Sequence, residues 1–222
     1  MRAYLLLLLV IARLIWWDLL DKIRIIVSWR WARRAMDRDV SSRARGLLAI
    51  ARLTIGLRIK NEVDESDMPK RILIVANHQS VIDIIVIMAV FRRHSVRFVA
   101  KKELQSGFPA VSRVLRVQRH ALISRHGDFS TAMRRIERLG RSIRDGEGAV
   151  IFAEGTRSRD GSVRTFHSGA IRRLHSAQPL ALVAVAIDGG WRFSRVVELS
   201  RLEPGHRYRV ASVAVYSVVH TK

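Results

Sequence analysis

After Pro69, short runs of aliphatic residues alternate with segments of helical periodicity. Helices are predicted at Ile84–Phe91 and over residues 129–146, where Asp128 can cap the start and Gly146 the end. Strands that alternate with helices predict an α/β domain with a central, mostly parallel sheet flanked by helices. In such sheets the working residues lie where strands end and loops begin. Four aliphatic runs are typical of strands buried on both faces: Arg71–Ala76, Val96–Ala100, Ala149–Ala153 and Leu180–Ile187.

The N-terminal segment has a different pattern, which begins with an uninterrupted apolar run over Ala3–Ala12. We expect one helix over residues 3–36 and a break within Asp37–Ser42, where either Ser41 or Ser42 can cap a second helix that runs to Leu57. Two helices joined by a short break predict an N-terminal helical hairpin.

A helix that crosses a membrane needs roughly 20 predominantly apolar residues, and this segment reaches that length only by including Arg13 and Asp18. Trp16 and Trp17 close the apolar stretch, and indole rings favour the headgroup level of a bilayer. A basic segment follows. These features predict a membrane anchor, either embedded in one leaflet or spanning with a tilt. An apolar helix docked on the protein's own core is the alternative; a signal peptide fits less well, because no small-x-small cleavage site follows Ala12.

The chain has 222 residues, enough for one well-packed domain, and the acidic stretch Asn61–Pro69 is expected to divide the hairpin (residues 1–60) from that domain (61–222). Cysteine is absent, which excludes disulfides, thiolate zinc sites and a cysteine nucleophile. The formal net charge is +21, so the chain should bind polyanions. Nucleic acid, an anionic membrane, an acidic protein and a phosphate-bearing substrate are all compatible with the charge alone.

His78 follows the first buried strand, and Asp83 lies near the start of the next helix. A separation of five positions can fold the carboxylate back onto the imidazole. A carboxylate on one ring nitrogen fixes the tautomer and leaves the other nitrogen able to take a proton from an alcohol. Taken alone this spacing is weak, and a solvent-facing histidine beside a helix-capping aspartate is the favoured interpretation of it.

A second polar cluster, "FAEGTRS", follows the strand at Ala149–Ala153. Arginine beside backbone amides at a strand end is suited to hold a phosphate. The cluster is not a Walker loop, because the chain contains no G-x4-G-K-[ST] sequence, and Asp160-Gly161 is predicted to be a plain turn. A third feature, "VAKKEL", puts a basic pair after the second strand, where an exposed helix start is the default interpretation.

Together these features resemble the 1-acylglycerol-3-phosphate acyltransferases and the wider glycerolipid acyltransferase family. "NHQSVID" is similar to the family's His-x4-Asp block, and "AKKEL" follows it. "FAEGTRS" is similar to the Glu-Gly-Thr-Arg-Ser block, and "FHSGA" to a Phe-Lys-x-Gly-Ala block. The order and intervals also agree, over about residues 70–190, and two full blocks in the right order are far more specific than either alone.

The resemblance implies direct transfer of an acyl group from a thioester of acyl carrier protein or coenzyme A to the hydroxyl of a lysophospholipid, by default lysophosphatidic acid. His78 would deprotonate that hydroxyl, and Asp83 would orient and charge-balance His78. Arg157 and Lys101 would pair with the phosphate. The resemblance implies that the acceptor site is lined by Glu154, Gly155, Thr156, Arg157 and Ser158.

The chain departs from the family pattern in three acceptor-related blocks. "ALISRHG" retains only Arg125 as an acceptor contact, His167 stands where lysine is usual, and Ala184 stands where the late block has its second proline. These changes affect acceptor recognition more than the dyad. Glycerol-3-phosphate or the lyso form of an amino-acid lipid therefore stays open as the acceptor.

A basic, non-catalytic module that binds nucleic acid or anionic lipid is the alternative from a different class, but no helix-turn-helix or RNP-type signature appears, so no nucleic-acid partner is expected. No cofactor or metal is expected, and Ser80 lacks a nucleophile elbow. Basic flanks favour the cytoplasmic face of the bacterial inner membrane. The remaining histidines lack metal-ligand spacing and are predicted to be surface residues: His94, His120, His126, His175, His206 and His220.

Overall fold

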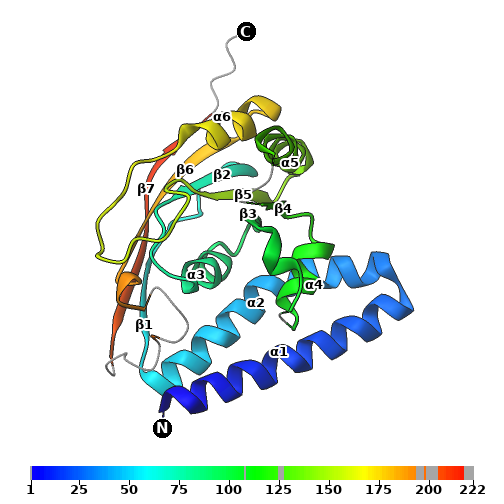
Figure 1. Cartoon of the computed structure of the whole chain (residues 1–222), viewed down its shortest axis with the longest axis vertical. Coiled ribbons are helices and arrows are strands. Elements are labelled where there is room, and N and C mark those ends of the chain that lie inside the picture. Colours follow the sequence, from blue (N-terminus) through cyan, green and yellow to red (C-terminus); the bar gives the residue numbers. More distant parts are fainter. Residues whose placement is uncertain (1, 108, 125–127, 194–197, 199–204, 218–222) are drawn as a thin grey trace.

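A computed structural model describes the whole chain except residues 1, 108, 125–127, 194–197, 199–204 and 218–222 (Figure 1). Its centre is a seven-stranded sheet with the order β1-β7-β6-β2-β5-β3-β4. Neighbouring strands are parallel except β6 and β7, which are antiparallel. The strands are β1 (Arg58–Glu62), β2 (Arg71–Ala76), β3 (Ser95–Lys101), β4 (Ala121–Ile123), β5 (Glu147–Phe152), β6 (Ala181–Asp188) and β7 (Arg207–Tyr216).

Helices cover both faces of this sheet, and alternate side chains of β2 show the division. Ile72 and Ile74 pack into a core shared with α2 and α3, whereas Leu73 and Val75 pack into a core shared with α5 and α6. Figure 1 shows α5 and α6 on one side of the strands and α2 and α3 on the other. The helices are α1 (Arg2–Val27), α2 (Trp29–Ile55), α3 (Ile82–Val90), α4 (Val111–Val117), α5 (Phe129–Ser142) and α6 (Ser168–Ala177), with short 3-10 turns at Lys102–Gln105 and Trp191–Phe193.

The predicted fold class is confirmed, and the four predicted strands are found as β2, β3, β5 and β6. The expected cap on α5 is also present, because the Asp128 carboxylate accepts hydrogen bonds from the N–H groups of Ser130 and Thr131. The predicted end of that helix at Gly146 is late, since α5 ends at Ser142.

The N-terminal hairpin is present, but the predicted position of its break is wrong. Helix α1 ends at Val27, and Ser28, in an extended conformation, caps α2 by accepting a hydrogen bond from the N–H of Trp31. The stretch Asp37–Ser42 lies inside α2. Aspartate and serine often interrupt helices, but here both have partners that the helix tolerates. The hydroxyl of Ser42 donates to the carbonyl of Asp39, and the carboxylate of Asp39 pairs with Arg24 of α1.

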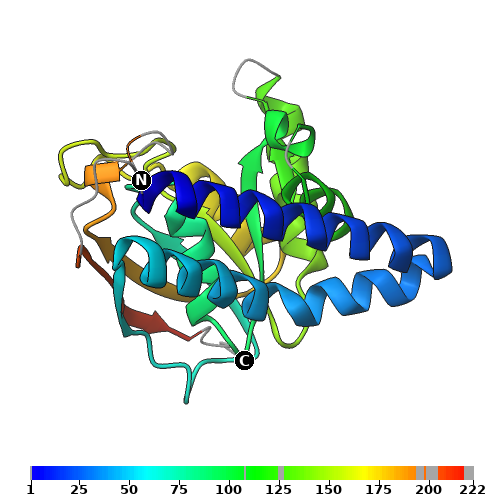
Figure 2. The ribbon, with the colours of Figure 1, turned by 90° about the horizontal axis from the view of Figure 1, so that it is seen from below.

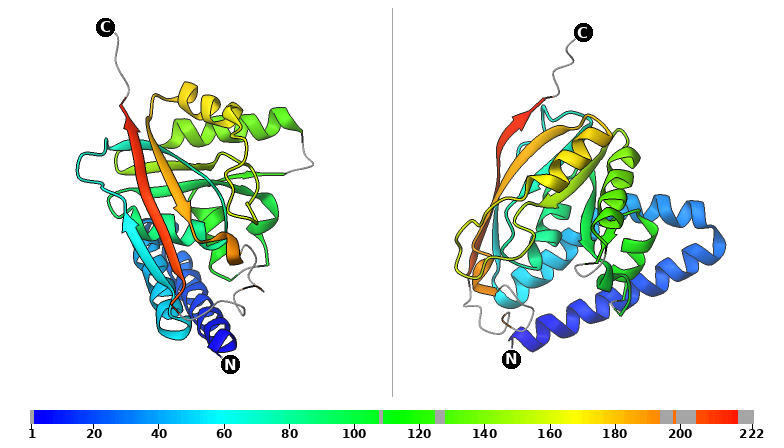
Figure 3. Two further views of the ribbon diagram at one scale, coloured as in Figure 1. Left: turned by 90° about the vertical axis from the view of Figure 1, so that its left-hand side faces the viewer. Right: turned by 45° about the horizontal axis from the view of Figure 1, so that its top comes forward.

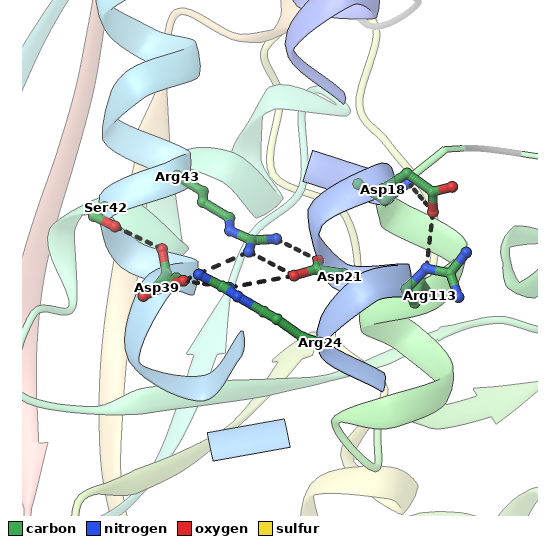
Figure 4. A network of polar contacts seen from close by, with 8 residues as sticks. Asp18, Asp21, Arg24, Asp39, Ser42, Arg43 and Arg113 are labelled. Carbon is green, nitrogen blue, oxygen red and sulfur yellow. Dashed lines mark hydrogen bonds and ion pairs between the residues drawn. The ribbon is translucent and has the colours of Figure 1, made fainter. Parts of the chain in front are cut away.

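Ion pairs hold α1 against α2 and α4 (Figure 4). The carboxylate of Asp21, fully buried, accepts two hydrogen bonds from Arg43 of α2 at 2.6 and 2.7 Å. Asp18 accepts one from Arg113 of α4 at 2.9 Å. Figure 2 shows the two long helices side by side across one face of the molecule. Asp18, one of the two charges that weakened α1 as a spanning segment, thus has a partner within the protein.

Away from these contacts, the side chains of α1 are mostly apolar and exposed. It is long and apolar enough to cross a membrane, and only 11% of its most apolar window is buried within the protein. Exposed apolar side chains lie along it from Tyr4 to Val27. Helix α1 therefore carries a continuous apolar surface that the described part of the protein leaves uncovered, which gives limited support to the predicted anchor.

Candidate active site

The side chains of His78 and Asp83 meet at the carboxyl end of β2. The strand ends at Ala76, and α3 begins at Ile82, so Asp83 lies in the first turn of the helix and points back toward the strand end. The Nδ1 atom of His78 lies 2.7 Å from Oδ2 of Asp83. The contact expected from the spacing is therefore present, and the alternative of an unconnected surface histidine does not hold.

Asp83 is fully buried and surrounded by hydrogen-bond donors. Its Oδ2 also accepts from the backbone N–H groups of Gln79 at 2.6 Å and Ser80 at 2.9 Å, and its Oδ1 accepts from the hydroxyl of Tyr208. Both oxygens of Asp83 thus accept hydrogen bonds. We assign the proton of Nδ1 of His78 to the contact with Oδ2, which leaves Nε2 to take part in proton transfer.

The imidazole of His78 stacks on the ring of Phe152, the last residue of β5. The ring centroids are 3.9 Å apart and the planes differ by 13°. With 16% of its side chain exposed, His78 is accessible but held on one face by an apolar wall. This contact was not predicted; the parallel register that pairs Ala76 with Phe152 brings the two residues together.

Glu154 fastens the loop after β5 to the backbone of His78. Its Oε1 accepts from the N–H of His78 at 2.9 Å, and its Oε2 accepts from the N–H of Arg164 at 3.1 Å. In return the N–H of Ser158 donates to the carbonyl of His78 at 2.7 Å. Gly155 adopts φ +65°, a left-handed conformation that glycine tolerates best, and this turn lets the loop close. Glu154 is buried, so its contacts here fix the loop in position.

The far half of that loop is fixed by Asp160. Its Oδ1 accepts hydrogen bonds from the hydroxyls of Ser158 and Ser162 and from the N–H of Ser162. These hydrogen bonds lower the pKa of Asp160 to about 2, and the bond from the Ser162 hydroxyl has the largest effect. Gly161 follows at φ +84°. The predicted turn at Asp160-Gly161 is thus an ordered loop rather than a loose connection.

The remaining predicted acceptor residues lie at different distances from the dyad. Thr156 and Arg157 are half-buried in the loop that Ser158 ties to His78. Lys101, exposed, ends β3, which is separated from β2 by β5; two strand spacings are about 10 Å. Arg125 lies outside the described residues. The structure therefore brings the Glu154–Ser158 loop to His78 and leaves Lys101 at the same sheet edge, farther away.

Polar side chains that the sequence analysis did not assign to the site stabilise the end of β2. Asn77 donates to the carbonyl of Ile187 at 2.8 Å and accepts from its N–H at 2.7 Å, which ties β2 to the end of β6. Gln79 accepts from the N–H of Gly190 at 3.0 Å. Ser80 is buried, and its hydroxyl donates to the carbonyl of Phe193. Ser80 is thus a structural residue, in line with the absence of a nucleophile elbow.

Two of the histidines predicted to lie on the surface are buried, and that prediction is wrong for them. His94 contacts Glu65 and the carbonyl of Pro69, and the Nδ1 of His120 accepts from the N–H of Phe98 at 2.9 Å. His175 is exposed and His206 half-buried, whereas His126 and His220 lie outside the described residues. Within the described ranges no three His, Asp or Glu side chains gather to hold a metal ion.

The fold is that of a known lipid enzyme. The structure matches the crystal structure of the 1-acyl-sn-glycerophosphate (LPA) acyltransferase PlsC from Thermotoga maritima with a TM-score of 0.73, over 100% of this chain and 87% of that one, at 16% sequence identity. At this identity the likeness establishes the architecture alone.

Sequence similarity then defines the family. A family model for acyltransferases matches residues 58–188, which include both polar blocks, and the chain belongs to that family. A relative, the lyso-ornithine lipid O-acyltransferase of Rhizobium meliloti (strain 1021), is 33% identical over 140 residues. That alignment covers 61% of this chain and 46% of the relative, so the chain spans about half the length of the curated relative it matches.

Proposed function

We propose that this protein is a membrane-bound O-acyltransferase that moves a fatty acyl group from an acyl thioester to the free hydroxyl of a lysolipid. The observation that carries the proposal is the His78–Asp83 pair, 2.7 Å apart at the carboxyl edge of the sheet, beside the loop that Glu154 anchors. The thioester would be that of acyl carrier protein or coenzyme A. His78 and Asp83 would supply the acid–base chemistry.

His78 is the general base of the proposed reaction. Nε2 takes the proton of the lysolipid hydroxyl as its oxygen attacks the thioester carbonyl, and the ester C–O bond forms as the C–S bond breaks. The proton on His78 then goes to the departing thiolate. Asp83 orients the ring and stabilises the imidazolium. The stack on Phe152 provides an apolar surface beside the base, which suits a lipid hydroxyl.

The basic groups around the site suit an anionic headgroup. Arg157 lies next to Ser158, whose N–H binds the backbone of His78, so its guanidinium is the first candidate to pair with a phosphate. Lys101, and Arg125 in its own loop, are the further candidates. Lysophosphatidic acid is therefore the first acceptor we propose, and phosphatidic acid the product.

A lyso-ornithine lipid is the second candidate acceptor. It is favoured by the 33% identity to a lyso-ornithine lipid O-acyltransferase and by the departures from the acceptor blocks at His167 and Ala184. Its carboxylate would be bound by the same arginine that we assign to the phosphate.

Helix α1 is the proposed membrane anchor, with the catalytic domain on the cytoplasmic side, where acyl thioesters are found. Replacing Leu8, Trp16 and Ile23, all exposed on α1, with serine should reduce co-flotation with vesicles that contain anionic lipid. Phe129→Ser, at an exposed position on α5, is the matched control and should float like the wild type. Equal flotation of all three proteins would contradict the anchor.

An acceptor panel tests the proposed reaction. Purified protein in detergent is given labelled acyl carrier protein thioester or acyl coenzyme A with lysophosphatidic acid, lyso-ornithine lipid or glycerol-3-phosphate. We expect a labelled diacyl product from one of the two lysolipids. Arg157→Ala should raise the KM for that lysolipid at least tenfold and leave the donor KM unchanged, while Arg141→Ala, at an exposed position on α5, should change neither. No product with any acceptor would contradict the proposed reaction.

A further inference from the structure

Tyr208, on β7, the strand that lies between β1 and β6, reaches the carboxylate that orients His78. Its side chain is fully buried, and its hydroxyl donates to Oδ1 of Asp83, on the oxygen opposite the one that faces His78. The two residues are 125 positions apart, and Tyr208 lies beyond the segment 58–188 that the family model matches. The contact thus comes from a part of the chain that the two acyltransferase blocks do not include.

The strands on both sides of β7 fix the position of this tyrosine. In the parallel pair with β1, Tyr208 is opposite Ile59, and the next residues of β7 pair with the end of β6 (Figure 3). The ring of Phe193 packs against it with centroids 6.4 Å apart. Gly190 leaves the necessary space, because a Cβ there would lie 3.1 Å from the tyrosine ring and 3.2 Å from Oδ1 of Asp83.

Toward the carboxylate of Asp83, the hydroxyl of Tyr208 is the hydrogen-bond donor. Burial, together with the nearby charge of Asp83, raises the pKa of Tyr208 well above 10. A neutral hydroxyl and an ionised carboxylate form a charge-assisted hydrogen bond, which is stronger than one between neutral groups. The other charged groups near the pair are His78 on Oδ2, Glu154 on the backbone of His78, and Asp188, which faces Tyr208 from β6.

We propose that Tyr208 is a positioning residue for the acyl transfer, which holds the carboxylate of Asp83 so that Oδ2 meets Nδ1 of His78. The inference rests on the proposed function, since it assigns a third member to the same proton-transfer device. Without the hydroxyl, Oδ1 would be buried without this donor, and the carboxylate could rotate away from the imidazole.

Tyr208→Phe tests this assignment, because it removes the hydroxyl and keeps the ring that packs on Phe193. Tyr216→Phe is the matched control, on the same strand and exposed. We expect Tyr208→Phe to lower kcat on the order of 10-fold, as for loss of one hydrogen bond to a charged group, with the acceptor KM unchanged within about twofold. Tyr216→Phe should match the wild type in both.

A measurement that does not depend on turnover accompanies the kinetics. The proton on Nδ1 of His78, bound to Asp83, should give a low-field resonance in the proton NMR spectrum that is absent from His78→Ala. That resonance should shift or broaden in Tyr208→Phe and stay in place in Tyr216→Phe. An unchanged resonance, or unchanged kcat in an active enzyme, would overturn the role of Tyr208. A wild-type protein without activity would instead contradict the proposed function, and the resonance would still decide the contact.

Discussion

The ion pair between Asp21 and Arg43 should contribute strongly to the attachment of α1. The side chain of Asp21 is fully buried and that of Arg43 is 11% exposed, and two hydrogen bonds of 2.6 and 2.7 Å join them. Removing one member of a buried pair typically costs about 3–5 kcal/mol, because the remaining charge is uncompensated. In Arg43→Gln, Arg24 still lies 3.4 Å from Asp21, so we expect the lower end of that range, about 3 kcal/mol.

For a chain of this size a loss of about 3 kcal/mol corresponds to a fall in Tm of about 6–12 °C. Thermal unfolding followed by circular dichroism in one detergent measures it. Arg45→Gln, at an exposed position two residues further along α2, is the control and should stay close to the wild type. Asp21→Asn combined with Arg43→Gln should recover part of the loss, because no charge is then left unpaired.

Two outcomes would refute this reasoning. If Arg43→Gln and Arg45→Gln had the same Tm, the pair would not hold α1 to α2. If the effects of Asp21→Asn and Arg43→Gln simply added in the double variant, the two side chains would not interact in the folded protein, and the hairpin would have to be held by its apolar contacts alone.

Two further predictions concern the core and the site. Burial, with a smaller effect of Arg97, lowers the pKa of His120 to about 3. Below about pH 6.5 the unfolded chain therefore binds a proton that the folded chain does not. The free energy of unfolding thus decreases as the pH is lowered, by about 2 kcal/mol between pH 7 and pH 5. His120→Asn, whose amide oxygen can replace the acceptor for the Phe98 N–H, should reduce that loss in urea unfolding at the two pH values, and an undiminished loss would refute it. Gly190→Ala should lower activity, because its Cβ would lie 3.2 Å from the buried carboxylate of the dyad and would displace it. Gly169→Ala, with open space around its Cβ, is the control, and equal activity of the two variants would contradict the packing described.

The parts of the fold that sequence patterns predicted are those that leave a signal in a short stretch of sequence. β2, β3, β5 and β6 are aliphatic because they lie inside the sheet, and the Asp128 cap is a contact between near neighbours. The edge strand β1 was missed because its sequence, RIKNE, is polar and its side chains are largely exposed. The break at Ser28 was missed because a single capping serine ends one helix and starts the next without any run of polar residues.

The same distinction holds at the site. His78 and Asp83 could be paired from the sequence because five residues separate them, and the resemblance to two acyltransferase blocks raised that pair above chance. The contact of Phe152 with His78 depends on strand register, and the contact of Tyr208 with Asp83 joins residues 125 positions apart. The sequence carries no local signal for either contact. His120 was assigned to the surface because its neighbours are charged, whereas in the fold its Nδ1 satisfies a buried backbone N–H.

The central claim is that His78 is the base in thioester-dependent acylation of a lysolipid, and one measurement tests it most directly. The rate of labelled acyl transfer to the preferred lysolipid is compared for the wild type, His78→Ala and His175→Ala, the last an exposed histidine on α6, with folding checked by circular dichroism. A general base contributes about 100- to 10,000-fold, so His78→Ala should lose at least about 100-fold in kcat while it stays folded and His175→Ala keeps the wild-type rate. Folded His78→Ala protein that transfers acyl groups at the wild-type rate would contradict the account.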